Sequence, residues 1–180
     1  MCDATMSGNG FALSDERGQI QDAIEITSDK GNICREIMSE LTDWFSEPAV
    51  IEACAEAIES LPMFGCIDKN RVAGFVAMQS HPPDAMEILV IATRRAYHRS
   101  GIGKRLLAAA EDCARTAGCK ILTVKTLARR GKDEPQYDAT RAFYDKNGFI
   151  RAEIFPTLWG EGHPCLFFVK PLEPSVDHVT

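Results

Sequence analysis

The sequence predicts an α/β protein whose central sheet is mixed, mostly antiparallel and covered by helices on both faces. Short apolar runs typical of strands are interspersed with segments in which apolar residues recur at helical spacing. Residues 86–128 form a strand, a long helix and a second strand, and such a crossover makes its two strands parallel. A two-residue hairpin elsewhere makes another pair antiparallel. The expected element order is βααβββαβαββ.

The first part of the chain predicts one strand and two helices. Residues 20–28 alternate imperfectly between apolar and polar side chains, as a half-buried strand does. From Asn32 the apolar positions change to helical spacing and include Trp44 and Phe45. Pro48 suits the first turn of a second helix, which Pro62 ends.

The rest of the chain predicts a β-rich region with two more helices. The polar pair Lys69-Asn70 separates two runs of strand character, which favours a hairpin. Residues 86–93 are apolar apart from Glu87 and Thr93 and predict a central strand. The clearest helix runs from Gly101 to Gly118, with apolar residues along one face. The other elements expected here are strands 63–69 and 71–81, strand 120–128, helix 137–148 and strands 149–157 and 164–172.

The length of 180 residues favours one domain. No internal repeat or linker divides the chain, so residues 20–172 are expected to form a single domain. Residues 1–19 are rich in Gly, Ser, Asn and Asp, and we expect a flexible N-terminal tail there. Residues 173–180 are expected to form a C-terminal tail.

Composition excludes several classes of function. The net charge of −6, from 20 basic against 26 acidic residues, makes nucleic acid an unlikely partner. No apolar run reaches the roughly 18 residues of a membrane-spanning helix, so we expect no membrane partner. Seven cysteines without a C-x-x-C pair favour a reduced, cytoplasmic protein. His163 and Cys165 lack a second pair of ligands, so no metal is expected.

One short segment departs from the acidic average. Between Arg94 and Ala110 there are five basic residues and no acidic one. Within this segment the loop from His98 to Lys104 is glycine-rich and lies between the central strand and the long helix. A helix N-terminus after such a loop offers free N–H groups and a positive dipole end, which together bind anions. The segment therefore predicts a site for a small polyanion.

Three known kinds of glycine turn compete for this loop. An NTPase phosphate loop requires a glycine where His98 stands and Ser or Thr where Arg105 stands. A dinucleotide-binding loop requires a glycine where Leu106 stands. Both patterns fail, and a simple tight turn without a ligand stays open as the third alternative.

The loop also resembles the acyl-CoA signature [QR]-x-x-G-x-[GA] of the GNAT superfamily of N-acetyltransferases. Residues 141–149, RAFYDKNGF, resemble the second signature of that family, and Tyr97 stands where the family often has an aromatic residue. The element order over residues 20–172 is similar as well. His98 replaces the first Gln or Arg of the signature, but it keeps a polar group that can donate a hydrogen bond.

The resemblance implies transfer of an acetyl group from acetyl-CoA to a primary amine, by direct attack in a ternary complex without a metal. Acetyl-CoA would be a co-substrate and the acceptor a small-molecule or peptide amine. A homodimer is possible, and the sequence leaves the oligomeric state open. The alternative is a non-catalytic acyl-CoA-binding module that regulates a partner.

Two residues are candidates for proton transfer. Glu87 lies eleven positions before His98, the offset that the resemblance implies for the catalytic base. Its sequence neighbours are apolar, and such a setting raises the pKa of a carboxyl group. The resemblance places Tyr144 over the coenzyme sulfur as the acid. The alternatives are a solvent-facing glutamate and a tyrosine that serves only in packing.

The resemblance also implies where the ligands lie. Pantetheine would pair with the main chain of Ile91 and Thr93, where the central strand and strand 120–128 diverge. The coenzyme phosphates would meet the loop residues His98, Arg99, Ser100, Gly101, Ile102, Gly103 and Lys104. The candidate acceptor residues are Trp44, Phe45 and Trp159, each of which could equally be a packing residue.

Overall fold

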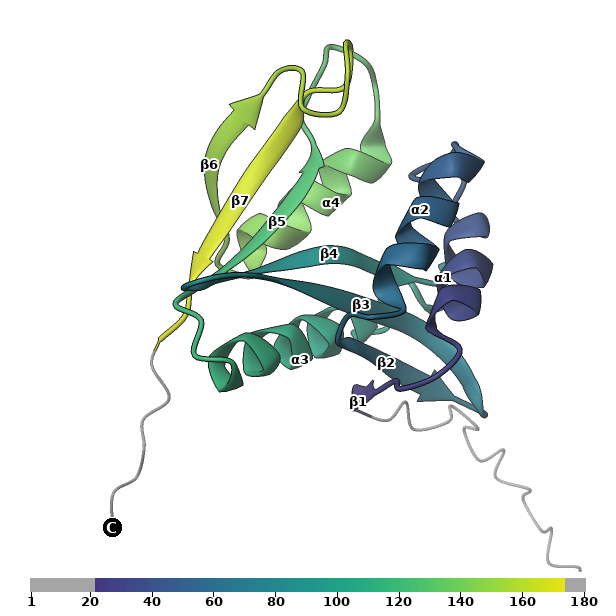
Figure 1. Ribbon diagram of the computed structural model, residues 1–180. Coiled ribbons are helices and arrows are strands. Elements are labelled where there is room, and N and C mark those ends of the chain that lie inside the picture. The colour runs from purple at the N-terminus through teal and green to yellow at the C-terminus, as the bar shows by residue number, and fades with distance from the viewer. Residues whose placement is uncertain (1–21, 174–180) are drawn as a thin grey trace, which may run out of the picture.

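Seven strands form one open sheet in the computed structural model, which describes residues 22–173 (Figure 1). The sheet order is β1-β2-β3-β4-β5-β7-β6, and only the β4–β5 pair is parallel. The mixed, mostly antiparallel sheet is therefore confirmed. The strands are β1 (Ile24–Glu25), β2 (Met63–Asp68), β3 (Arg71–His81), β4 (Ala85–Thr93), β5 (Ile121–Leu127), β6 (Ile150–Phe155) and β7 (Cys165–Pro171).

Residues 22–173 also contain four α-helices and one short 3₁₀-helix, and the predicted order βααβββαβαββ is confirmed. They are α1 (Lys30–Ser39), α2 (Pro48–Ile58), η1 (Arg95–Tyr97), α3 (Ile102–Thr116) and α4 (Pro135–Lys146). No helix within residues 22–173 is both long and apolar enough to cross a membrane. The tails expected over residues 1–19 and 173–180 lie outside the described residues, apart from Glu173.

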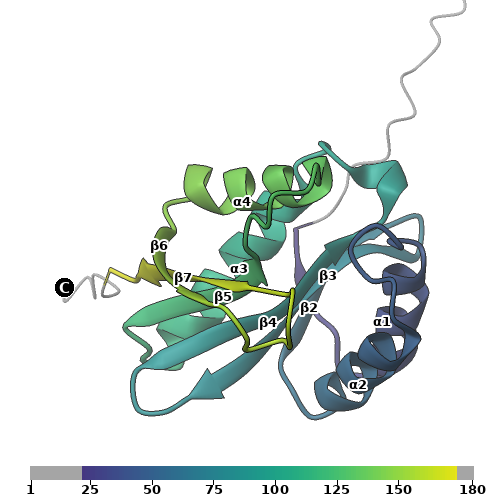
Figure 2. The same cartoon turned by 90° about the horizontal axis from the view of Figure 1, so that it is seen from above.

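The helices lie in two layers, one on each face of the sheet (Figure 2). Side chains alternate along a strand, and β3 accordingly supplies Phe75 to the core beneath α1 and α2, and Val76 to the core beneath α3. Each large side chain buried in these cores contributes about 1.5–3 kcal/mol relative to an exposed one. Helices on both faces are therefore confirmed.

The predicted hairpin forms at Lys69 and Asn70. Both residues have positive φ angles, 46° and 64°, which is the conformation of a two-residue type I′ turn. This turn matches the twist of the two strands that it joins, β2 and β3, and so fixes their antiparallel register.

Two elements are shorter than expected. Helix α1 ends at Ser39, so Trp44 and Phe45 lie in the connection to α2 and not on a helix face. The last turn tightens, because the amides of Glu40 and Leu41 bond to carbonyls three residues earlier. Strand β1 keeps only the two residues that pair with β2.

Strands β4 and β5 diverge halfway along their length (Figure 1). Their parallel pairing joins residues 85–88 of β4 to residues 121–124 of β5 and ends there. Leu89 interrupts the register of β4 with β3, since Ala77 pairs with Val90 and Met78 with Ile88. The carboxyl ends of diverging parallel strands are a common place for ligands in α/β folds.

Candidate active site

The N-terminus of α3 is open to solvent. Gly101 precedes the helix with a φ of 90°, and no side chain caps the helix or places an acidic group in its first turn. A Cβ atom added at Gly101 would meet no heavy atom within 4 Å. The first amides of the helix therefore lack intrahelical partners and are available to an anion.

The basic segment divides into two groups. Arg94 is only 2% exposed, and its guanidinium binds Glu36 of α1 and Glu40 at the end of that helix, and donates to the carbonyl of Val72 at 2.8 Å. Arg94 therefore holds α1 against the sheet. Arg94 is thus committed to these contacts within the protein.

Arg95 also turns toward the α1–α2 connection, where its Nη2 lies 2.7 Å from Oδ2 of Asp43. Arg99 and Lys104 are different, because both are exposed and neither has an ion pair among residues 22–173. Arg99 has a φ of 63°, which turns the backbone sharply before the helix. These two cations flank the free amides of α3, and the loop therefore fits a phosphate group.

His98 connects the loop to the end of β4. Its Nε2 lies 2.8 Å from the carbonyl oxygen of Thr93, and a carbonyl only accepts, so Nε2 carries the proton. The ring also meets Trp44 edge-on, with the centroids 5.7 Å apart. Ile91 pairs with β3 and is half-buried. The coenzyme contacts assigned to Ile91 and Thr93 stay predictions.

Glu87 is buried on β4, with an exposed fraction of 6%. The Nζ atom of Lys125 lies 2.7 Å from both of its carboxylate oxygens, and Nε2 of His81 donates to Oε2 at 2.9 Å. The sequence neighbours of Glu87 suggested apolar surroundings, but this carboxylate is surrounded by polar groups. Its role as the base stays a prediction.

The Glu87–Lys125 pair lies at the point of strand divergence. Glu87 is within the last paired segment of β4, and Lys125 directly follows Val124, the last residue of β5 paired with β4. Ile88 and Val124 belong to the core beneath α3. Because side chains alternate, Glu87 and Lys125 face the opposite side of the sheet, the side of α1 and α2.

Tyr144 is part of an aromatic cluster in α4 and β7. It is 3% exposed, and its ring centroid lies 5.4–5.5 Å from those of Phe143, Phe149 and Phe168. Burial raises the pKa of its phenol above the usual value of 10. The hydroxyl therefore stays protonated at neutral pH, which suits an acid, while the ring contacts suit packing. The catalytic role stays a prediction.

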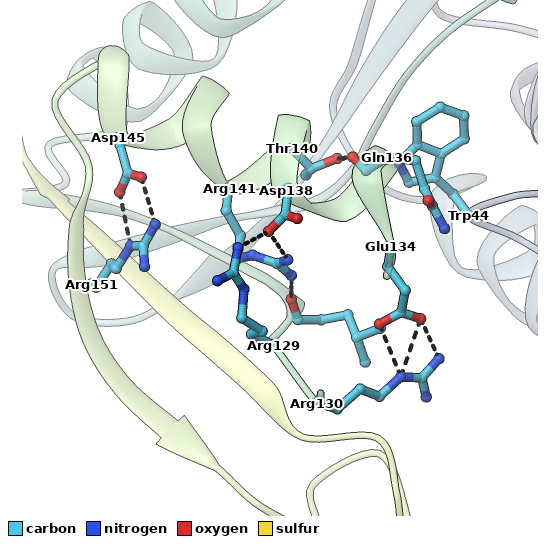
Figure 3. Close-up of polar contacts among 11 residues, drawn as sticks. Trp44, Arg129, Arg130, Glu134, Gln136, Asp138, Thr140, Arg141, Asp145 and Arg151 are labelled. Carbon is cyan, nitrogen blue, oxygen red and sulfur yellow. Dashed lines mark hydrogen bonds and ion pairs between the residues drawn. The ribbon is translucent and has the colours of Figure 1, made fainter. Parts of the chain in front are cut away.

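The three candidate acceptor residues lie in different places. Trp44 joins the α1–α2 connection to α4, since its Nε1 donates to Oγ1 of Thr140 at 3.1 Å (Figure 3). Its carbonyl also accepts from the hydroxyl of Tyr137 at 2.9 Å. Phe45 packs against the core beneath α1 and α2. Trp159 lies between β6 and β7 and is 45% exposed. Their contacts with an acceptor stay predictions.

Three sites of interaction were not found from the sequence. Lys125 and His81 bind Glu87, as described above. A groove of about 880 Å³ between α4 and β6 contains Arg141, whose Nη2 lies 2.7 Å from Oδ1 of Asp138 (Figure 3). One feature of the sequence could have indicated Lys125, since it is the single charged residue in the buried strand ILTVKTL.

No group of three His, Cys, Asp or Glu side chains within residues 22–173 is arranged to hold a metal ion.

Comparisons with known proteins agree with this fold. The model of the acetyltransferase (GNAT) family matches residues 32–149, which is more than half of the chain. None of the curated proteins compared with the chain matches it in sequence.

Solved structures share the fold at low sequence identity. A GNAT-family protein from Desulfovibrio desulfuricans is 17% identical, with a TM-score of 0.71 over 84% of this chain and 98% of its own. An aminoglycoside 6'-N-acetyltransferase complexed with coenzyme A is 15% identical, with a TM-score of 0.68 over 87% and 100%. A GNAT-family acetyltransferase from Elizabethkingia anophelis with acetyl-CoA bound is 17% identical, with a TM-score of 0.66 over 83% and 97%. With its two signatures, its open α3 N-terminus and the family match, the chain belongs to the GNAT acetyltransferase family.

Proposed function

We propose that this protein transfers an acetyl group from acetyl-CoA to a primary amine by direct attack in a ternary complex, without a metal. One juxtaposition carries the proposal. The uncapped N-terminus of α3 follows the end of β4, and the buried carboxylate of Glu87 lies on the same strand where β4 and β5 diverge. An anion site and a candidate base therefore flank one divergence point.

The coenzyme would be held mainly by main-chain groups. The amides at the start of α3 suit its pyrophosphate, and the exposed side chains of Arg99 and Lys104 add positive charge. Two solved relatives contain coenzyme A or acetyl-CoA, which supports the same ligand here. The proposed coenzyme-binding residues are Ile91, Thr93, His98, Arg99, Ser100, Gly101, Ile102, Gly103 and Lys104.

The proposed reaction needs two proton transfers. The attacking amine has to be neutral, and Glu87 would accept its proton through a water molecule. Lys125 contacts both carboxylate oxygens and His81 contacts only Oε2, so Oε1 keeps one more lone-pair position for that water. As the C–N bond forms and the C–S bond breaks, the protonated hydroxyl of Tyr144 would donate to the departing thiolate.

The acceptor is proposed to be a small-molecule or peptide amine. The aminoglycoside 6'-N-acetyltransferase among the structural relatives supports a small polar amine. The net charge of −6 also favours a cationic acceptor, because opposite charges attract over a distance. Trp44, Phe45 and Trp159 are the side chains proposed to select it.

A non-catalytic acyl-CoA-binding module is the second candidate. It is favoured by the contacts of Glu87 with Lys125 and His81, and by the packing of Tyr144 among aromatic rings. Such a module would bind the coenzyme through the same loop but would have no use for a base.

The two candidates are separated by incubating the protein with acetyl-CoA and a panel of amines, while free thiol and acetylated amine are measured. Release of thiol together with an acetylated amine supports the enzyme. Thermal stabilisation by acetyl-CoA without release supports the binding module. If acetyl-CoA neither stabilises the protein nor is consumed, both candidates are wrong.

Glu87→Gln is the variant that tests the base. The amide keeps the shape of the side chain but cannot accept the proton, so turnover should fall about 100-fold or more. The affinity for acetyl-CoA should stay nearly unchanged, because Glu87 lies on β4 away from the phosphate loop. Full turnover by this variant at every pH would remove Glu87 from the mechanism.

A further inference from the structure

We propose that Lys125 is an internal acetyl acceptor, which the protein acetylates itself when acetyl-CoA is bound and no external amine is present. The inference rests on the proposed function, because it uses the same base and the same acyl thioester. It adds a modification site within the active-site region.

The position of Lys125 is the first observation that supports the proposal. It is the first residue of β5 beyond the segment paired with β4, where the two strands separate. Its side chain is 28% exposed, which leaves the amine reachable from outside the sheet. The residues on both sides of it in sequence, Val124 and Thr126, are buried.

The contact of Lys125 with Glu87 is the second observation that supports the proposal. Nζ lies 2.7 Å from Oε1 and 2.7 Å from Oε2 of Glu87, a carboxylate that is itself 6% exposed. A lysine ammonium has an ordinary pKa of about 10.4 and has to lose a proton before it can attack a carbonyl. Lys125 is therefore an amine already bound to the group that is proposed to deprotonate amines.

The groups that face this amine come from three neighbouring strands. Glu87 of β4 contacts it directly, and His81 of β3 contacts Glu87. Cys165 of β7 is buried, and the positive charge of Lys125 partly offsets the effect of burial, which raises the pKa of that thiol. Among these groups, Lys125 is the amine that contacts the carboxylate of Glu87.

The step balances as an ordinary acyl transfer. Lys125 gives one proton to Glu87, and its neutral Nζ attacks the carbonyl carbon of the thioester. The C–N bond forms, the C–S bond breaks, and the thiolate leaves and takes a proton as coenzyme A. The products are acetyl-lysine, coenzyme A and one proton, which Glu87 returns to solvent.

Acetylation would also change the site. The acetylated lysine carries no charge and cannot form the ion pair, so Glu87 would lose its ammonium partner and keep only His81. The alternative is that Lys125 only balances the charge of a buried carboxylate. The two possibilities differ in whether an acetyl group ever appears on Nζ.

The experiment incubates the purified full-length protein with acetyl-CoA and no amine, and follows intact mass and then peptide masses over time. We expect one acetyl group on Lys125, added at a rate independent of protein concentration. Lys120 is the matched control within the same protein, since its side chain is 75% exposed and binds Asp84 outside the site. Acetylation of Lys125 should exceed that of Lys120 by at least about tenfold, because the base lies next to it.

Two further measurements test the route. Glu87→Gln should slow acetylation of Lys125 by about 100-fold, and Lys125→Arg should abolish the added mass while keeping the positive charge. Excess coenzyme A should suppress acetylation of Lys125 and leave that of Lys120 unchanged. This competition needs no variant and holds even if Glu87→Gln fails to fold.

The failures are distinguishable. If external amines are acetylated but Lys125 is not, the inference is wrong and the proposed function stands. If Lys125 and Lys120 react at equal rates, or coenzyme A does not compete, the modification is chemical and the inference is wrong. If acetyl-CoA is neither bound nor consumed, the proposed function fails first.

Discussion

The Nε2 atom of His98 lies 2.8 Å from the carbonyl oxygen of Thr93, and this bond ties the glycine loop to the last residue of β4. The family signature has Gln or Arg where His98 stands. The bond shows that a histidine at this position can still donate to the protein's own backbone, which fixes the start of the loop.

We therefore expect His98→Ala to loosen the loop and weaken acetyl-CoA binding. The lost hydrogen bond is worth about 0.5–1.5 kcal/mol, which corresponds to an increase in Kd of roughly two- to twelvefold. Isothermal titration with acetyl-CoA measures it. His98→Gln is the control, since its amide can still donate, and an equal loss in both variants would contradict this role for the bond.

Arg94 and Lys104 should respond in opposite ways, although both belong to the same basic segment. Arg94→Met removes the buried guanidinium that binds Glu36, Glu40 and the carbonyl of Val72, and should lower the free energy of unfolding by about 1–3 kcal/mol, because these hydrogen bonds are lost. The affinity for acetyl-CoA should change little. Urea unfolding and titration calorimetry measure the two quantities.

Lys104→Ala should show the reverse pattern, with unchanged stability and weaker coenzyme binding. Its side chain is exposed, so its removal leaves the core intact. The loss in affinity should shrink at high salt, because salt screens exposed charges. Equal coenzyme affinity of Lys104→Ala and wild type at low salt would remove Lys104 from the site.

Tyr144→Phe separates catalysis from packing. The ring contacts remain, so the free energy of unfolding should change by less than about 1 kcal/mol. If the hydroxyl protonates the thiolate, kcat should fall about tenfold or more while KM for acetyl-CoA stays similar. Steady-state kinetics with an amine that the panel experiment shows to be acetylated measures both constants. An unchanged kcat would assign Tyr144 to packing alone.

The buried thiol of Cys34 should make the free energy of unfolding depend on pH in the alkaline range. Burial raises the pKa of its thiol from 9.0 to about 12, so the folded state holds this proton more tightly than the unfolded state. Its contribution to stability is complete below pH 9 and is lost as the pH rises from 9 toward 12, with a slope of up to about 1.4 kcal/mol per pH unit.

Urea unfolding at a series of alkaline pH values measures that slope. Cys34→Ala has no group to titrate at this position and should show a smaller slope over the same range. The thiol of Cys34 should also resist alkylation at neutral pH in the folded protein. Rapid alkylation of Cys34 without unfolding would contradict its burial.

Local sequence patterns predicted most of the fold. Three features depend only on residues that are close together in the sequence, so local patterns were enough to predict them. They are the hairpin turn at Lys69 and Asn70, the glycine before α3 and the helix in residues 101–118. Trp44 shows where this fails. Its spacing fits a helix, but contacts with α4, whose Thr140 lies 96 positions later, hold it in the connection.

The site shows the same division more sharply. Sequence alone determined the glycine loop, the element order and the two family signatures, because each is a local pattern or a succession of such patterns. Only the tertiary structure decided that Arg94 turns into ion pairs with α1, that Tyr144 is enclosed by aromatic rings, and that Lys125 binds Glu87 from 38 positions away. The physical reason is that charge pairing and burial depend on which strands and helices meet, and no local pattern specifies those partners.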